Sequence, residues 1–541
     1  MTAQPTQTKH TIPWFLYPIC IVLTILLILS TVYWLVPTIR YHHAEQLLAK
    51  GQYQEAATAF AALGNYSDSL DRATGTRYQY AEAQVAQRNY PEAIQIFTSI
   101  LSYKDCAERI PECNYLYVDV LMEEGKYEEA YALLEALGDY QNAASSIPQY
   151  RFREGEAMLA EGKFEQAIAI FSSLSDHPDS SKLLQESHYR LGAQQLENQN
   201  YEGAISSLIQ AGAYEDAPKL LAKAYGQHAQ QLQEAGHLGK AAIAFYHGGD
   251  RAQSLALWDQ VATRNPIGLG VYHNTAIRTG GNLRAAYLLS SYIHYPRTDA
   301  CSVTEWKNAI SLAAGDGFTA VLCNDMTVTA TGTIITNGYS PNAWKDIVSI
   351  AAGNHHLIGL QADGTAIAIG NSEKGACDVQ SWTDLVAVSA GNNFSVGLKA
   401  DGTLLLAGDI AILEEANAWT DIRAISAGDS HLVAIKADGT ALACGVNSNN
   451  QCNVSTWTDL VSIAAGEVQT IGLRSDGTVV STAYAVLDGM IGQAKLTGIV
   501  AVDANARRVG ILRNDGILYI AGAVSAVEIT LVTWDDILQP K

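Results

Sequence analysis

The stretch from Trp344 to Gly370, WKDIVSIAAGNHHLIGLQADGTAIAIG, decides the fold of the C-terminal half of the chain. Alternating apolar residues flank the dipeptide Asp363-Gly364, and an Asp-Gly pair between two such runs predicts a tight β-hairpin. The chain repeats this dipeptide downstream, with glycine directly after Asp401, Asp438, Asp476 and Asp515. The stretch therefore predicts a small antiparallel sheet that is used several times.

The glycine that follows the first strand of this unit, Gly353, marks a regular register. Its counterparts lie at spacings of 45, 38, 38, 37, 38 and 39 residues, and they are Gly270, Gly315, Gly391, Gly428, Gly466 and, in the seventh position, Asn505. Small sheets that recur at this period are the signature of a β-propeller. We predict a seven-bladed β-propeller over residues 262–541.

The two ends of this array are complementary. The first copy, around Gly270, lacks the opening Trp-x-Asp-Ile motif, whereas the C-terminus carries an additional one from Trp534 to Ile537. We therefore predict that the C-terminal strand completes the first blade, which closes the ring and removes both free sheet edges.

The repeat resembles that of the regulator of chromosome condensation family. The resemblance rests on Trp-x-Asp-Ile-Val-x-Ile-Ala-Ala-Gly-x-x-His, then Asp-Gly-Thr, Gly-x-Asn and a Cys-x-Val before the next tryptophan, and it extends over about 270 residues. It implies a propeller that binds other proteins, as secreted bacterial relatives do. The eukaryotic archetype exchanges nucleotide on a small GTPase and binds chromatin.

A second array precedes the first, over residues 41–260. Alanine stands three residues and a large apolar residue seven residues after each of six positions spaced 37 apart: Tyr53, Tyr90, Tyr127, Phe164, Tyr201 and Leu238. Offsets of 0, 3 and 7 share one face of a helix. The run Gly-x-Tyr-x-x-Ala-x-x-x-Phe-x-x-Leu resembles part of a tetratricopeptide repeat. We predict an α-solenoid of six helical hairpins, in which glycines such as Gly51 end helices and aspartates such as Asp68 and Asp105 cap the next ones.

The N-terminal residues read as a short tail, 1–12, and a membrane segment, 13–37. The segment carries no charged residue, and aromatic residues flank its aliphatic centre. A cleaved signal peptide is the alternative, but no small-residue cleavage site follows the apolar run. The numbers of lysine and arginine residues on the two sides of the segment are nearly equal, so charge does not set its orientation. We infer the orientation from the large folded region that follows it. We expect a single-pass protein of the cell membrane with most of the chain extracytoplasmic.

Composition limits the chemistry. The net charge is −21, and both arrays are acidic, which makes a nucleic-acid partner improbable. The eight cysteines have neither the spacing of a disulfide framework nor that of a zinc site. No nucleophile elbow, phosphate-binding loop or His-Glu-x-x-His motif is present. We expect no cofactor, no metal and no enzymatic activity.

Candidate binding residues directly follow the repeat glycines and differ between copies. They are Tyr272, His355, Asn392, Asn393, Asp429, Glu467 and Arg507. Two longer loops, Tyr287 to Asp299 and Ala411 to Asn417, add Tyr292, Tyr295 and Ile412 as apolar anchors. All of these residues remain compatible with ordinary polar loops.

Three histidines, His273, His356 and His431, share one position that Phe318, Phe394, Gln469 and Arg508 occupy in other copies, so we predict a structural role for them.

We predict from the sequence a membrane-anchored scaffold, monomeric, whose two arrays bind protein partners without a chemical step. One alternative is a carbohydrate-binding module or enzyme of the cell envelope, which would need aromatic platforms on an exposed face. Another is nucleotide exchange on a small GTPase, which the acidic charge and the membrane segment disfavour.

Overall fold

The structure is a computed structural model, and it describes residues 16–287, 299–303, 305–482, 497–505, 507–525 and 528–539. The chain divides into two compact units, Met1–Leu191 and Gly192–Lys541. The first unit holds the N-terminal helix and most of the helical repeats. The second unit holds the last helical repeats together with all of the described β-strands.

One continuous helix opens the described chain. It consists of α1 (Leu16–Ser30), the π-helical turn η1 (Thr31–Leu35) and α2 (Val36–Ala49), with Pro37 near the start of α2. Proline lacks a backbone N–H and its ring crowds the preceding turn, so a wide π turn directly before it lets the helix continue. The described residues include one helix long and apolar enough to cross a membrane, Ile21–Ala49. A signal sequence would meet the same criteria, so membrane insertion stays a prediction.

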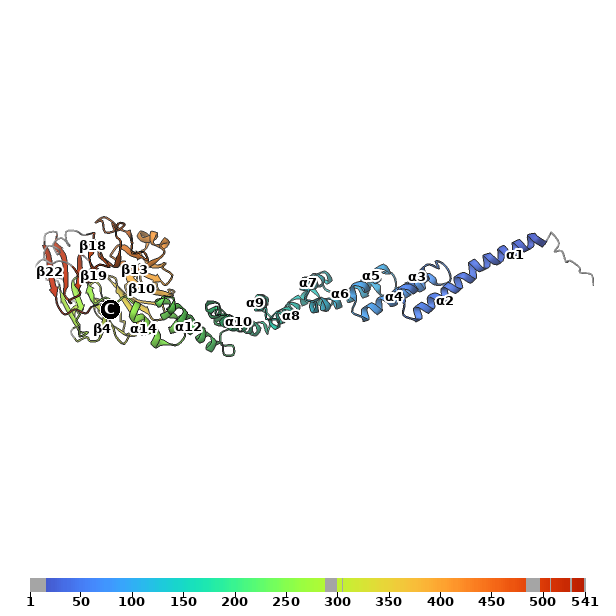
Figure 1. Cartoon of the computed structure of the whole chain (residues 1–541), viewed down its shortest axis with the longest axis horizontal. Coiled ribbons are helices and arrows are strands. Elements are labelled where there is room, and N and C mark those ends of the chain that lie inside the picture. Colours follow the sequence, from blue (N-terminus) through green and yellow to red (C-terminus); the bar gives the residue numbers. More distant parts are fainter. Residues whose placement is uncertain are drawn as a thin grey trace, which may run out of the picture. The chain divides into compact units, whose positions relative to one another are not determined.

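The helical repeats follow as pairs of a short and a long helix (Figure 1). Each predicted anchor residue is the first residue of a short helix. The short helices are α3 (Tyr53–Ala61), α5 (Tyr90–Ser99), α7 (Tyr127–Leu137), α9 (Phe164–Ser173), α11 (Tyr201–Ala211) and α13 (Leu238–His247). The long helices are α4 (Ser69–Ala86), α6 (Cys106–Glu123), α8 (Ile147–Ala160), α10 (Ser180–Glu197), α12 (Ala217–Glu234) and α14 (Arg251–Val261). The short 3₁₀ turns η2 (Tyr140–Asn142) and η3 (Ala144–Ser146) precede α8.

Burial follows the predicted face of the short helices. The alanine at offset three is fully buried in every repeat, at Ala56, Ala93, Ala130, Ala167, Ala204 and Ala241. The large residue at offset seven is buried too, at Phe60, Phe97, Leu134, Phe171, Leu208 and Phe245. Small alanine side chains let neighbouring helices approach, and the large residues fill the space between them. The resemblance of the N-terminal half to tetratricopeptide repeats is thus confirmed at the level of helical hairpins.

The aspartates predicted to cap helices have another partner. Asp68 and Asp105 occupy the positions just before α4 and α6, but neither side chain makes a capping hydrogen bond. Instead each carboxylate accepts a hydrogen bond from a tyrosine hydroxyl 27 residues upstream, Tyr41 at 2.6 Å and Tyr78 at 2.8 Å. The capping prediction is wrong because carbonyl groups of the preceding turn already bond to nearby backbone N–H groups, such as that of Ser69 to the carbonyl of Tyr66. The aspartates therefore tie neighbouring helices together.

The described β-strands of the second unit form seven antiparallel sheets, numbered here 1 to 7 in chain order. Sheet 1 consists of β1 (Ile267–Leu269), β2 (His273–Ile277) and β3 (Leu283–Tyr287), and sheet 2 of β4 (Ala309–Ala314), β5 (Phe318–Cys323) and β6 (Val328–Gly332). Sheet 3 consists of β7 (Ile347–Ala352), β8 (His356–Gln361) and β9 (Ala366–Gly370), and sheet 4 of β10 (Leu385–Ala390), β11 (Phe394–Lys399) and β12 (Leu404–Gly408). Sheet 5 consists of β13 (Ile422–Ala427), β14 (His431–Lys436) and β15 (Ala441–Gly445), and sheet 6 of β16 (Leu460–Ala465), β17 (Thr470–Arg474) and β18 (Val479–Ser481). Sheet 7 has four strands, β19 (Ile499–Asn505), β20 (Arg508–Arg513), β21 (Leu518–Ser525) and β22 (Glu528–Trp534).

The sheets present two different ends. At the hairpin-turn end lie the Asp-Gly turns between the second and third strands, as at Asp363-Gly364, where the aspartate accepts hydrogen bonds from Thr365. At the glycine-turn end lie the turns that follow the repeat glycines and join the first strand to the second. A side chain on Gly353 would overlap the carbonyl oxygen of Gly391 in the next sheet, so glycine permits this close approach.

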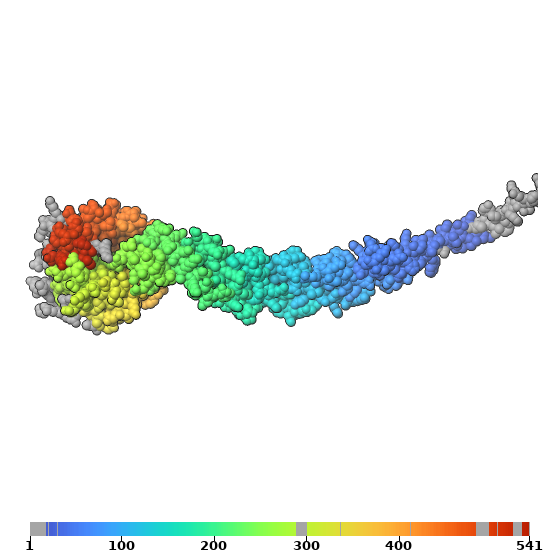
Figure 2. Space-filling model, turned by 60° about the horizontal axis from the view of Figure 1, so that its bottom comes forward, coloured from blue at the N-terminus to red at the C-terminus, as the bar shows by residue number. Residues whose placement is uncertain are grey.

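Sheets 1 and 7 meet through the C-terminal segment. The Ile537 N–H donates to the Gly516 carbonyl of sheet 7 at 3.1 Å, and the Leu538 N–H donates to the Ile277 carbonyl of sheet 1 at 2.8 Å. The bridge between Arg278 and Ile537 is the counterpart of the pairing between Gln361 and Ile347 in sheet 3. Figure 2 shows the red C-terminal residues beside the yellow-green residues of the first sheets.

The C-terminal segment therefore pairs with the first sheet in the predicted register, but it supplies only part of the missing strand. Ile537 and Leu538 provide the start of its inner strand, and β1 provides the remainder. The residues just before, β22, form a fourth strand on sheet 7, which the sequence analysis did not predict.

The last helical pair packs on the sheets of its own unit (Figure 1). The Trp258 indole is fully buried, and its N–H donates to the Ala362 carbonyl at 2.9 Å. Arg251 forms an ion pair with Asp346, which also accepts a hydrogen bond from the Tyr246 hydroxyl at 3.0 Å. These contacts lie at the hairpin-turn end of sheet 3. The helices α13 and α14 thus share a hydrophobic core with the sheets.

We expect Trp258→Ala to destabilise the sheets as well as the helices. Loss of a fully buried indole typically costs about 3–5 kcal/mol. Thermal unfolding followed by far-ultraviolet circular dichroism would show the strand signal melting at a lower temperature. Arg251→Ala is the matched control, because an exposed ion pair contributes at most about 1 kcal/mol. If Trp258→Ala lowers only the helical transition, the shared core is not a cooperative unit.

We also expect a chain that ends at Thr533 to be strongly destabilised. This truncation removes Trp534 and Ile537, which are both buried in the core between sheets 7 and 1. A chain that ends at Gln539 keeps both residues and serves as the control. The melting temperature of the shorter chain should fall by several degrees or more, since about 1 kcal/mol shifts the melting point of a large domain by roughly 2–4 °C. Equal melting temperatures would exclude a closing role for this segment.

Candidate functional site

The predicted binding residues that follow the repeat glycines all lie at the glycine-turn end. His355 and Arg507 are exposed, whereas Tyr272, Asn392, Asn393, Asp429 and Glu467 are half-buried. Backbone hydrogen bonds link the turns of neighbouring sheets, since the Asn392 N–H donates to the Asp429 carbonyl at 3.3 Å. Their role in binding stays a prediction.

The structure describes little of the three predicted apolar loop anchors. Tyr292 and Tyr295 lie outside the described residues. Ile412 belongs to the 3₁₀ helix η5 (Ala411–Ala418), and its side chain is not described. The loop from Ala411 leaves sheet 4 at the glycine-turn end, where the Asp409 N–H donates to the Asn393 carbonyl at 3.0 Å.

Three carboxylates approach one another at the first position after the repeat glycine. They come from sheets 2, 5 and 6, at Asp316, Asp429 and Glu467. Burial raises the pKa of Asp429, and the negative charges of Glu467 and Asp316 raise it further. Burial also raises the pKa of Asp316. The Asn354 amide donates to the Asp429 carboxylate at 3.3 Å. Asp316 and Asn354 were absent from the sequence prediction, although they share the position of Asp429 and Glu467.

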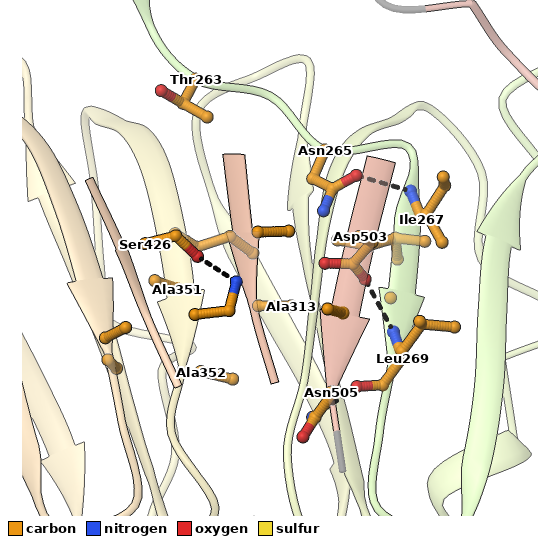
Figure 3. Close-up of a pocket in the computed structure, with 18 of the residues that line it drawn as sticks. Thr263, Asn265, Ile267, Leu269, Ala313, Ala351, Ala352, Ser426, Asp503 and Asn505 are labelled. Carbon is orange, nitrogen blue, oxygen red and sulfur yellow. Dashed lines mark hydrogen bonds between the residues drawn. The ribbon is translucent and has the colours of Figure 1, made fainter. Parts of the chain in front are cut away.

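A cavity of about 480 Å³ lies between the first strands of the sheets (Figure 3). At the hairpin-turn end it is lined by residues 260–266, and toward the glycine-turn end by Asn354 and Asp429. Its middle is bordered by small side chains such as Ala313, Ala351 and Ser426, which leave room between the strands (Figure 3).

A further carboxylate, that of Asp503, belongs to the wall of this cavity. Two residues before the repeat glycine, every other sheet has a small residue: Gly268, Ala313, Ala351, Ser389, Ser426 and Ala464. Asp503 accepts a hydrogen bond from the Leu269 N–H of sheet 1 at 3.1 Å (Figure 3). Ser389 and Ser426 accept the equivalent bond from the next sheet at 3.0 Å. Its removal from bulk water raises the pKa of Asp503 to about 7.

Sheet 7 departs from the repeat at two further positions, and both side chains bond to sheet 1. Asn505 replaces the repeat glycine, and its amide donates to the Leu269 carbonyl. Arg508 replaces the histidine, phenylalanine or glutamine of the other sheets, and its guanidinium donates to the carbonyls of Gly270 and Val271. These polar side chains connect two sheets that are far apart in the sequence.

The three histidines are structural. His356 is fully buried, with its ring against Gly353, and its Nε2 lies 2.9 Å from the Ser395 hydroxyl of the next sheet. That hydroxyl donates to the Ala376 carbonyl at 2.8 Å, so Nε2 carries the proton and donates to Ser395. His273 and His431 make the same bond to Thr319 and Thr470. Burial lowers the pKa of each of the three rings to about 4.

Comparisons with known proteins agree with the repeats. The model of the regulator of chromosome condensation (RCC1) repeat matches residues 422–451, which form sheet 5. No curated protein matches the chain. Among solved structures, Prp20p from Saccharomyces cerevisiae is 16% identical, with 50% of this chain and 83% of that chain covered and a TM-score of 0.35. The ectodomain of the receptor kinase CR4 from Physcomitrella patens is 19% identical, with 48% and 72% covered and a TM-score of 0.37.

The helical half has its own counterparts. The tetratricopeptide-repeat domain of P58(IPK) is 13% identical, with 41% of this chain and 72% of that chain covered and a TM-score of 0.17. Likenesses with TM-scores this low carry no argument about function. The family match confirms the predicted resemblance of the C-terminal half to RCC1 repeats.

The buried histidines predict an acid-sensitive fold. Each ring is neutral in the folded chain, with a pKa of about 4, but titrates near pH 6.5 when unfolded. The unfolded chain therefore binds more protons between these values, and stability falls as the pH drops from about 6.5 to about 4. His356→Gln, which introduces the residue that sheet 6 has at Gln469, should make this fall shallower.

Urea midpoints measured at pH 7 and pH 5 would test this expectation. The difference between the two midpoints should be smaller for His356→Gln than for the parent chain. His42→Gln is the control, because His42 is exposed. An unchanged pH dependence in His356→Gln would exclude the buried ring as a source of acid sensitivity.

Proposed function

We propose that the chain is a membrane-anchored interaction scaffold whose seven sheets are the blades of a closed β-propeller. The glycine-turn end of this propeller binds a protein partner, and the helical repeats offer a second binding surface. Closure is supported by the bonds that Asp503, Asn505 and the C-terminal segment make to sheet 1.

The observation that carries this proposal is that one end of the sheets packs against helices and the other end does not share this contact. The helices α13 and α14 pack at the hairpin-turn end, through Trp258 and Arg251. The glycine-turn end carries the residues that differ between repeats, and the loops that join the sheets leave from this end. Variable side chains on a rigid scaffold are the usual location of a binding site.

The absence of a chemical step is part of the proposal. Repeat arrays of these two kinds are typically interaction modules. Among the residues that the structure describes, no three His, Cys, Asp or Glu side chains could hold a metal ion together. We propose that the protein acts by binding alone and is monomeric.

The membrane anchor is the remaining part. We propose that the helix from Ile21 stays in the membrane and that both arrays lie on the extracytoplasmic side. Its length and composition support the first point, and the large acidic remainder is compatible with the second. Protease treatment of intact cells should then degrade both arrays, and their survival would contradict this topology.

Site-specific photo-crosslinking in cells expressing the full chain tests partner binding. A benzoylphenylalanine in place of His355, exposed at the glycine-turn end, should give a discrete protein adduct. The control is the same group in place of Thr458, which is exposed at the hairpin-turn end of sheet 6. Equal adducts from both positions, or none from His355, would contradict binding at the glycine-turn end.

A further inference from the structure

The helix that precedes the repeats keeps an exposed apolar surface as far as Ile39. Large apolar side chains are exposed along it from Ile19 onward, and Ile39 itself is 60% exposed. Twenty helical residues span about 30 Å, which is the thickness of the hydrocarbon core of a bilayer. Arg40, the next residue, is exposed and is the first charged residue of the described chain. The apolar surface therefore ends at Ile39.

The turn between α3 and α4 is held beside this end of the apolar surface. The hydroxyl oxygens of Thr38 and Tyr66 lie 2.7 Å apart. The Thr38 hydroxyl donates to the carbonyl of Trp34 one helical turn earlier, so the Tyr66 hydroxyl donates to Thr38. The Tyr66 ring also packs edge-on against Tyr41, with 6.1 Å between the ring centroids. The turn thus lies at the level of Thr38, one residue before the apolar surface ends.

The rest of the first hairpin leads away from this level. After Tyr66, the next contacts with α2 lie further along both segments, because Asp68 accepts a hydrogen bond from Tyr41 and Arg72 forms an ion pair with Glu45. The helix α4 therefore runs in the same direction as α2, and its 18 residues carry its far end about 27 Å beyond the turn. In Figure 1, α3 and α4 lie beside α2, and α1 projects beyond them.

We propose that the α3–α4 turn, residues 62–67, lies in the lipid headgroup layer where the helix leaves the membrane. The headgroups add roughly 5–7 Å to each side of the hydrocarbon core, so a turn at the level of the last exposed apolar residue enters this layer. The turn presents Ala62, Asn65 and Ser67 there, all of them exposed. This inference rests on the proposed membrane anchor and extends it, because it gives the first helical hairpin a lipid contact of its own.

The charges near the turn indicate which lipid it fits. Asp68 and Asp71 are exposed at this end of the hairpin, against the one exposed guanidinium of Arg40. Two carboxylates against one cation do not attract anionic headgroups. The Asn65 amide and the Ser67 hydroxyl can instead bond to the phosphate and ester oxygens of a zwitterionic lipid. The lipid partner is therefore a zwitterionic phospholipid such as phosphatidylcholine.

Photo-crosslinking to lipid tests this placement. The full chain, with benzoylphenylalanine in place of Asn65, is reconstituted into phosphatidylcholine vesicles and irradiated, and the mass of the intact protein is then measured. We expect a phospholipid adduct at this position. The matched control is Gln87, which is exposed at the far end of the same helix α4 and should give no adduct above that of the unsubstituted chain.

A third position separates this inference from the membrane anchor on which it rests. Benzoylphenylalanine in place of Ile28, which is exposed in the middle of the apolar helix, reports insertion of the helix itself. An adduct at Ile28 without one at Asn65 would overturn the lipid contact of the turn and leave the anchor intact. No adduct at Ile28 would refute the anchor and the inference together.

Equal adducts at Asn65 and Gln87 would also overturn the proposal, because the contact would then not be confined to the turn. Circular dichroism of each variant establishes that it is folded. If the Asn65 variant does not fold, the same group in place of Ala62 decides the question, with the same expected adduct.

Discussion

The contact between sheets 1 and 7 is the constraint on which the β-half depends. The other neighbouring sheets follow one another directly in the chain, whereas these two are more than 200 residues apart. Residues that break the repeat supply extra bonds at this junction. Asp503, Asn505 and Arg508 all depart from the repeat, and all three donate to or accept from sheet 1. The C-terminal residues Ile537 and Leu538 add a β-bridge to Arg278 and backbone hydrogen bonds to both sheets.

The same residues connect structure and chemistry. A purely structural junction could use serine, as the contacts from Ser389 and Ser426 illustrate. The charged residue at Asp503 carries a desolvation cost that a neutral residue would avoid.

The regular parts of the fold were predictable because each repeat carries the same pattern of apolar, glycine and turn residues. Period and offset were sufficient to find the first residue of all six short helices and the strands around each Asp-Gly turn. The residues that break the repeat were harder. The strand β22 has no counterpart in other copies, and the tyrosine partners of Asp68 and Asp105 lie 27 residues away in the chain.

The predicted binding residues lie together at one end of the sheets, and their role in binding stays a prediction. Sequence comparison between repeats identified Asp429 and Glu467, yet it gave no reason to choose Asp316, whose neighbourhood depends on which sheets face one another across the cavity. Asp503 could have been found as the acidic residue at a position otherwise occupied by glycine, alanine or serine. The cavity beside Asp503 follows only from the way the sheets are arranged in space.

The packing of Trp258 on Ala362 has a consequence for how this protein can change in evolution. The last helical pair packs on the sheets, whereas the hairpins of a repeat array pack mainly against their neighbours in the array. Duplication or loss of a whole 37-residue unit in that region would preserve every helix-to-helix interface type. The number of hairpins could therefore change in evolution without altering the contact between α14 and the sheets.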